Sequence, residues 1–209
     1  MTSLWLLDER KFLTREEQSS LRSMARERLS GRPGERSRWI EWFVVELGLE
    51  SGLRVGEMAA LQCKDLLVEL DRPAMFVRRG KGGKPRMVYV RRKFAEAVRE
   101  FLTAKTGFGE PVNPDAPVFL SPRGGHLTSR ALEKAYDRVR FPAGLDAHNP
   151  HHLRHTYASE LYRASGGNLR LVQKQLGHAR ITTTQVYADV FDPDVDAAVS
   201  GLYARVGGN

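Results

Sequence analysis

The sequence has a single cysteine, Cys63, and no long run of apolar side chains among its 209 residues. One cysteine excludes an intramolecular disulfide and any zinc site built from a cysteine cluster. The longest apolar runs, such as residues 42–45, are far shorter than the roughly 18 residues of a membrane-spanning helix. The N-terminal segment has no basic region before its short apolar stretch and no small-residue cleavage site, so we expect no secretory signal. The sequence therefore predicts a soluble cytoplasmic protein with no membrane partner.

The composition is close to the average for globular proteins. Hydrophobic residues make up 41% of the chain and charged residues 28%, which excludes a collagen-like, low-complexity or largely disordered chain. A chain of this length can bury a sizeable core without disulfides or metals.

Basic side chains exceed acidic ones, and the net charge is +8. Residues 78–93 contain eight basic side chains and no acidic one. Such a block is typical of contact with a nucleic-acid backbone, although a solvated basic face has the same composition. Residues 187–209 contain four aspartates and one arginine, so DNA would repel this tail and contact with protein fits it better. The candidate DNA-binding residues are Arg78, Arg79, Lys84, Arg86 and Arg130.

Hydrophobic periodicity and capping signals predict helices over residues 14–29, 38–49, 54–62, 93–103, 127–140, 151–164, 168–177, 183–188 and 193–204. Two β-rich runs, residues 74–79 and 86–90, are joined by a glycine-rich turn and predict a hairpin. The expected fold is mainly α with a small antiparallel β-sheet or hairpin (α+β).

Two segments place a cation where it could bind a phosphate. Arg54 begins a helix, where backbone N–H groups can bind an anion, and Glu57 one turn later can hold the Arg54 guanidinium. An ordinary intrahelical ion pair is the alternative. Lys81 lies at the glycine-rich tip of the hairpin, from which it can swing into a site as a point charge or proton donor. A solvated turn is the alternative there.

A third segment, PHHLRHT over residues 150–156, puts His151 and Arg154 on one helix face. Histidine can exchange a proton near neutral pH, and arginine supplies a fixed positive charge for a phosphate. His151 and His155 also share a face, but no nearby cysteine or carboxylate completes a set of metal ligands. We therefore expect no metal.

The fourth segment, LGH over residues 176–178, is followed by Tyr187 nine residues after His178. Tyrosine, with a pKa of about 10, is a poor nucleophile unless cations and a base lie nearby. By base rate Tyr187 is a core or surface aromatic, but the other three segments contain the groups that would activate it.

In this order and spacing, the four segments resemble the catalytic domain of the tyrosine recombinase (phage integrase) family. In that family an Arg in a GLR..E segment, a Lys on a β-hairpin, an H.LRH segment and an LGH segment followed nine residues later by Tyr form one active site. The residues of this chain at those places are Arg54, Lys81, His151, Arg154, His178 and Tyr187. Residues 12–17 also resemble the usual start of the domain, so the resemblance covers nearly the whole chain.

The resemblance implies an enzyme that cleaves and rejoins double-stranded DNA without a cofactor. Tyr187 would attack the scissile phosphate, giving a 3′-phosphotyrosyl bond and a free 5′-hydroxyl. Arg54 and Arg154 would hold the non-bridging oxygens, where negative charge accumulates.

The resemblance also implies the proton transfers. Lys81 would protonate the departing 5′-oxygen, with Lys84 as the fallback on the same hairpin. His151 would accept the proton of the tyrosine, and His178 would hydrogen-bond the phosphate.

By the same resemblance, we expect a short extension (residues 1–12), a catalytic domain (13–190) and an acidic helical tail (191–209). The N-terminal helical domain that closes a clamp on DNA in many family members is expected to be absent. Expected partners are DNA and other recombinase protomers, the latter through the tail, where Val195, Val199 and Leu202 recur at helical spacing. A nucleoid-associated protein encoded by a bacterium, an archaeon or a phage is implied.

Two other functions stay open. One is a DNA-relaxing enzyme resembling type IB topoisomerases, and the other is a non-catalytic DNA-binding regulator on the same scaffold. The LGH segment and the small domain favour the recombinase over the first, and the complete set of site residues argues against the second.

Overall fold

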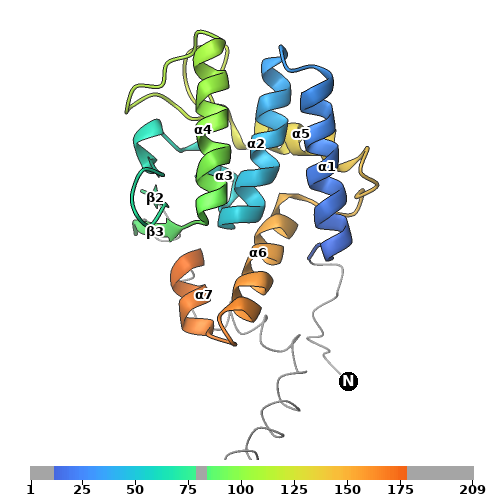
Figure 1. Ribbon diagram of the computed structural model, residues 1–209, viewed down its shortest axis with the longest axis vertical. Helices are drawn as coiled ribbons and strands as arrows, with labels where there is room; N and C mark the ends of the chain where they lie inside the picture. Colours follow the sequence, from blue (N-terminus) through green and yellow to red (C-terminus); the bar gives the residue numbers. More distant parts are fainter. Residues whose placement is uncertain (1–11, 79–83, 178–209) are drawn as a thin grey trace, which may run out of the picture.

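The computed structural model of the chain describes residues 12–78 and 84–177 (Figure 1). The helices and strands follow one another as α1 (Arg15–Gly31), α2 (Arg36–Ser51), α3 (Val55–Ala59), the 3-10 turn η2 (Cys63–Asp65), β1 (Leu66–Leu67), β2 (Ala74–Val77), β3 (Arg86–Tyr89), α4 (Arg92–Gly107), α5 (Ser129–Arg140), α6 (Pro150–Ala164) and α7 (Leu169–Leu176). The mainly helical fold with a small antiparallel sheet is confirmed.

Helix α2 lies at the centre of the molecule because it is apolar around most of its circumference, and α1, α4, α5 and α6 pack around it (Figure 1). Phe43 of α2 stacks on Phe101 of α4 with ring centroids 4.1 Å apart, and the Phe119 ring lies 5.8 Å from Phe43. Such aromatic contacts add to the free energy of simple burial. These contacts hold the middle of α2, and the helix stays buried to its C-terminus at Ser51, where the candidate site begins.

The sheet is antiparallel, in the order β1-β2-β3, and Val77 of β2 pairs with Arg86 of β3. Both predicted strands are present, while the two-residue β1 is too short to leave a pattern in the sequence. The tip of the hairpin, residues 79–83, lies outside the described residues. The two helices predicted over residues 183–188 and 193–204 also lie outside them.

The helix caps lie where the sequence predicts them. The Thr14 hydroxyl accepts a hydrogen bond from the Glu17 N–H (3.1 Å), and the Glu17 carboxylate accepts one from the Thr14 N–H (2.8 Å). Asn168 caps α7 through the Leu171 N–H, and Gly177 ends that helix with φ +67°. The predicted helix from residue 54 ends at Ala59 instead of residue 62, and Gln62 is the N-cap of η2.

Helix α7 packs against α6 and β3, below α2 and α4 in the view of Figure 1. Its buried residues Val172 and Leu176 form a small second core with Ala158 of α6. The end of α7, next to the LGH segment, is thus held between α6 and the sheet. Within the described part of the chain, no helix is both long and apolar enough to cross a bilayer.

Candidate active site

The turn between α2 and α3 presents Arg54. Gly52 ends α2 with φ +60°, and a Cβ there would collide with the side chains of Tyr157 and Leu176, so both the backbone angle and the space require glycine. Arg54 stands at the N-cap of α3, where its backbone N–H donates to the Glu57 carboxylate at 2.9 Å. Its guanidinium also donates to Glu57, at 3.0 Å, and the Arg54 side chain is 28% exposed. The expected Arg54–Glu57 pair is present.

Helix α6 supplies His151 and Arg154. Asn149 caps the helix by accepting a hydrogen bond from the His151 N–H at 2.9 Å, and Pro150 occupies the first turn. One turn later, the buried Arg154 donates to the Gly52 carbonyl at 2.6 Å and to the Leu176 carbonyl at 2.7 Å. Arg154 therefore ties α6 to the end of α2 and to the end of α7.

The carboxylate of Glu57 joins these segments. Arg154 Nη1 lies 3.8 Å from Glu57 Oε2, and Arg86 of β3 donates to both Glu57 oxygens at 2.9 Å. Burial raises the pKa of Glu57, but the hydrogen bonds from Arg86 and from the Arg54 N–H, with the nearby arginine charges, lower the pKa below its usual value. Glu57 is thus ionised at neutral pH, and the two motif arginines converge on it.

A groove of about 850 Å³ opens beside this cluster. Its lining includes Arg54, Glu57, the exposed His151, Arg78 and His126. The imidazole of His126 lies with Nδ1 2.9 Å from the Ala59 carbonyl oxygen. Sequence reasoning missed His126, which belongs to none of the four segments and reaches the groove through the loop before α5.

The candidate DNA-binding residues differ in their surroundings. Lys84 and Arg130 are exposed, whereas Arg78 is ion-paired with Asp65 at 2.7 Å. Arg86 was expected to contact DNA, but its side chain is only 9% exposed and points inward to Glu57. The remaining predicted site residues lie outside the described part of the chain: Arg79, Lys81, His178 and Tyr187.

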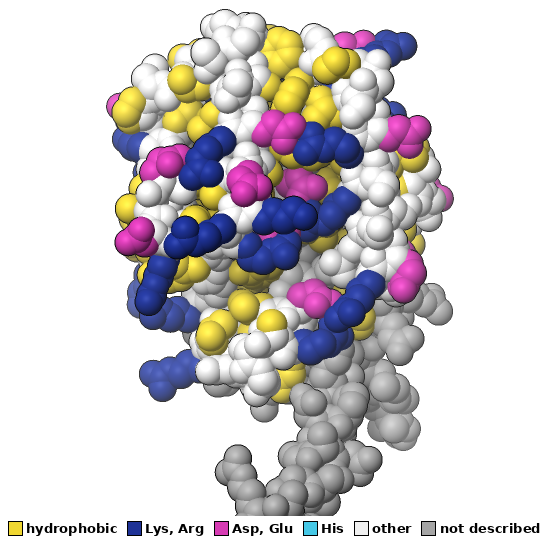
Figure 2. Space-filling view, in the orientation of Figure 1, with side chains coloured by type: hydrophobic (Ala, Val, Ile, Leu, Met, Phe, Trp, Pro, Cys, Tyr) yellow, Lys and Arg dark blue, Asp and Glu magenta, His cyan; other side chains and the backbone are white. Residues whose placement is uncertain are grey.

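On the face shown in Figure 2, Lys and Arg side chains form a band, with Asp and Glu side chains between them. Several arginines of α1 and of the segment before α4 are ion-paired. Arg22 and Arg91 both contact Glu50, and Arg26 lies 2.6 Å from Glu100. Much of the positive charge on these helices is therefore neutralised locally.

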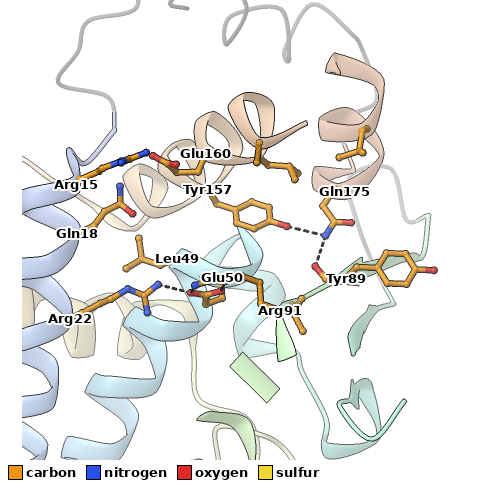
Figure 3. Close-up of a pocket in the computed structure, with 14 residues that line it drawn as sticks. Arg15, Gln18, Arg22, Leu49, Glu50, Tyr89, Arg91, Tyr157, Glu160 and Gln175 are labelled. Carbon is orange, nitrogen blue, oxygen red and sulfur yellow. Dashed lines mark hydrogen bonds and ion pairs between the residues drawn. The ribbon is translucent and has the colours of Figure 1, made fainter. Parts of the chain in front are cut away.

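A second groove, of about 680 Å³, lies between α1, α2, β3, α6 and α7 (Figure 3). Leu49, Val90, Leu161 and Leu171 give it an apolar lining. At its edge, the Gln175 amide donates to the Tyr89 carbonyl at 2.6 Å and to the Tyr157 hydroxyl at 2.9 Å. Three arginines and two glutamates complete the wall: Arg15, Arg22, Arg91, Glu50 and Glu160.

Comparison with known proteins agrees with this geometry. Residues 11–193 match the model of the phage integrase family. The chain belongs to the phage integrase family. It is 37% identical over 166 residues to tyrosine recombinase XerC of Methylobacterium nodulans, covering 78% of this chain and 49% of that protein. It is 36% identical over 151 residues to tyrosine recombinase XerD of Caulobacter vibrioides, covering 70% and 48%. This phage integrase family chain therefore spans about half the length of the curated relatives it matches.

Solved structures of the same kind share the fold. The XerH site-specific recombinase bound to its palindromic difH substrate, a post-cleavage complex, aligns with a TM-score of 0.73 at 27% identity, over 90% of this chain and 52% of that one. The catalytic domain of bacteriophage HP1 integrase aligns with a TM-score of 0.58 at 20% identity, over 90% and 93%. At that identity, the HP1 domain is similar in fold alone.

Proposed function

We propose that this chain is the catalytic part of a site-specific DNA recombinase that cleaves and rejoins DNA through a 3′-phosphotyrosyl intermediate. The observation that supports the proposal most directly is the convergence of Arg54 and Arg154 on Glu57 from separate elements. His151 lines the same groove as Arg54. Arg54 and His151 around one opening, with the buried Arg154 3.8 Å from Glu57 beside it, form a suitable environment for a phosphodiester.

In the proposed reaction, the Tyr187 phenolate oxygen forms a bond to the scissile phosphorus while the bond from phosphorus to the 5′-oxygen breaks. Arg54 and Arg154 donate to the non-bridging oxygens, where charge increases in the transition state. The phosphodiester energy is kept in the phosphotyrosyl bond, so rejoining needs no nucleotide cofactor. These guanidiniums and Lys81 neutralise charge as metal ions do in many nucleases.

Proton transfer would use the histidine and the lysine. His151 accepts the phenolic proton, and Lys81 protonates the leaving 5′-oxygen. His178 hydrogen-bonds the phosphate. Exposed Lys84 and Arg130 are proposed contacts to the DNA backbone.

The test is covalent trapping on nicked duplexes that lose the 5′-hydroxyl fragment after cleavage. Because no target site is assumed, a library of nicked duplexes with a randomised core is incubated with the 209-residue chain, and protein–DNA adducts that resist detergent are isolated. We expect adducts that form equally well with EDTA. Tyr187→Phe should abolish them and leave non-covalent binding intact, since only one hydroxyl is removed.

Arg154→Ala should slow adduct formation by on the order of 100-fold, the cost of one preorganised donor to the transition state. An adduct formed by Tyr187→Phe would refute the assignment of the nucleophile. No adduct from the unmutated chain on any duplex would refute the proposed reaction for this chain. Relaxation of supercoiled plasmid without strand exchange between two sites would favour the topoisomerase-like activity instead.

We also propose that protomers assemble on DNA through the acidic tail. Its Val195, Val199 and Leu202 match the apolar lining of the second groove (Figure 3). The tail of one protomer would lie in the groove of its neighbour.

Deletion of residues 192–209 should reduce cooperativity in gel-shift titrations on two-site DNA and leave single-site affinity unchanged. Leu171→Glu, at an exposed position of the groove, should have the same effect in the full chain and no further effect after the deletion. Cooperativity that survives both changes would refute the docking proposal.

A further inference from the structure

The Glu57 carboxylate is held by a third arginine that belongs to none of the four sequence segments. Arg86 donates from Nη1 to Oε1 and from Nη2 to Oε2, each at 2.9 Å. This two-pronged geometry is the strong form of the arginine–carboxylate pair. Arg54 makes one side-chain hydrogen bond to Glu57, at 3.0 Å, and Arg154 lies at 3.8 Å. By geometry, Arg86 is the main partner of Glu57.

Arg86 also contacts the end of α7. Its Nε donates to the Gln175 carbonyl at 3.1 Å. A Cβ on Gly177 would lie 2.8 Å from Arg86 Cδ and 3.0 Å from Arg86 Nε. Gly177, with φ +67°, is therefore required both by the backbone angle and by the room that Arg86 occupies. The Arg86 guanidinium thus links β3 to α3 and to Gln175 near the end of α7.

The contacts of Arg86 favour a role that acts through Glu57. Its side chain is 9% exposed and that of Glu57 is 7% exposed. Two charges so far removed from water are stable only when they are well paired, and loss of one partner leaves the other uncompensated.

We propose that Arg86 is a positioning residue of the cleavage reaction. It fixes the Glu57 carboxylate, which in turn orients Arg54, and it anchors the hairpin to the end of α7. The inference rests on the proposed function, because the orientation serves the phosphate that Arg54 and Arg154 would bind.

The test compares Arg86→Met with a matched control, Arg99→Met, in the 209-residue chain. Arg99 of α4 also pairs with a carboxylate, Glu69 at 2.8 Å, but it is 47% exposed and lies away from the cluster. Arg86→Met should slow single-turnover adduct formation at saturating DNA by on the order of 10- to 100-fold, as expected when reacting groups are misplaced by about 1 Å. Its DNA dissociation constant and salt dependence should stay unchanged, and Arg99→Met should change neither rate nor binding.

Two measurements separate positioning from a general loss of stability. Among the described residues, the charged groups in contact with Glu57 are Arg54, Arg86 and Arg154. Removal of Arg86 should raise the pKa of Glu57 in an NMR titration of its carboxyl carbon. If cleavage requires ionised Glu57, the acid limb of the pH–rate profile should move to higher pH by the same amount. Arg86→Lys keeps the charge and should keep the fold, with a smaller shift in pKa and a smaller loss of rate.

The double variant Glu57→Gln with Arg86→Met should be no slower than the slower single variant by more than about threefold, because both changes remove the same pair. Rate losses that multiply in the double variant would show that Arg86 and Glu57 act independently. A weaker salt dependence with full cleavage at saturating DNA would show that Arg86 contacts DNA. Either result would overturn the inference. An unmoved Glu57 pKa in Arg86→Met would also overturn it. Adduct formation at the full rate by Arg86→Met refutes this inference alone, whereas no adduct from the unmutated chain refutes the proposed function.

Discussion

Replacement of Gly48 by alanine probes the contact between α2 and α6 that brings the two motif arginines together. A Cβ at Gly48 would lie 2.5 Å from Leu153 Cδ1 and 3.1 Å from Leu153 Cβ. Leu153 is completely buried, so its side chain has little space into which it can rotate. The helices must therefore separate slightly to admit the methyl group.

Two effects of opposite sign decide the change in stability. Alanine is favoured over glycine inside a helix by about 1 kcal/mol. Overpacking a core costs typically about 1–3 kcal/mol, and two contacts this short favour the upper part of that range. We expect a net loss of about 1–2 kcal/mol, which lowers Tm by roughly 2–8 °C in a domain of this size.

The separation of α2 and α6 should also displace Arg154 in the candidate active site. Arg154 follows Leu153, and its hydrogen bond to the Gly52 carbonyl (2.6 Å) crosses the junction of α2 and α6. Movement of α6 would shift the Arg154 guanidinium, so adduct formation should slow by on the order of tenfold.

Urea unfolding and single-turnover trapping measure the two effects. The control is Gly107→Ala at the end of α4, where nothing lies within 4 Å of an added Cβ and a gain of up to about 1 kcal/mol is expected. Combining Gly48→Ala with Leu153→Ala should cost less than the sum of the two single changes. If Gly48→Ala stabilises the protein as much as Gly107→Ala does, the reasoning about the α2–α6 contact is wrong.

Three further predictions concern caps and charges. Burial raises the pKa of Glu50, but hydrogen bonds and charges from Arg91 and Arg22 lower it overall. The ionised Glu50 carboxylate therefore stabilises the fold above the unfolded pKa of about 4.3, and this stabilisation is lost as the pH falls through the folded pKa. Glu50→Gln should accordingly flatten the loss of stability below about pH 5 in acid-unfolding curves. Thr14→Ala removes the capping hydrogen bond of α1 and should lower the unfolding free energy by about 1 kcal/mol in urea titrations, whereas a change under about 0.2 kcal/mol would contradict the cap. Gly177→Ala, strained at φ +67° and in collision with Arg86, should slow adduct formation as Arg86→Met does, and a full rate would contradict that contact.

The sequence by itself determined the helices and their ends. The caps at Thr14, Asn149 and Asn168 depend on contacts between residues two or three positions apart, so the local sequence carries them. The pairing of Arg54 with Glu57 is local in the same sense and was predicted for the same reason. The four segments also identified the family, because their order and spacing are properties of the chain alone.

Only the tertiary structure decided which charges meet. In the sequence, Arg86 belongs to a basic block and looks like the nearby Lys84. In the fold, Arg86 pairs with Val77 at the start of β3 and binds Glu57, whereas Lys84 lies before the strand and is exposed. His126 reaches the groove, and Arg154 binds the carbonyls at the ends of α2 and α7, through contacts between distant parts of the chain. Such contacts leave no periodic signal, because the packing of whole helices and strands fixes them. A buried carboxylate is stable only when cations pair with it, and the fold brings Arg54, Arg86 and Arg154 to Glu57.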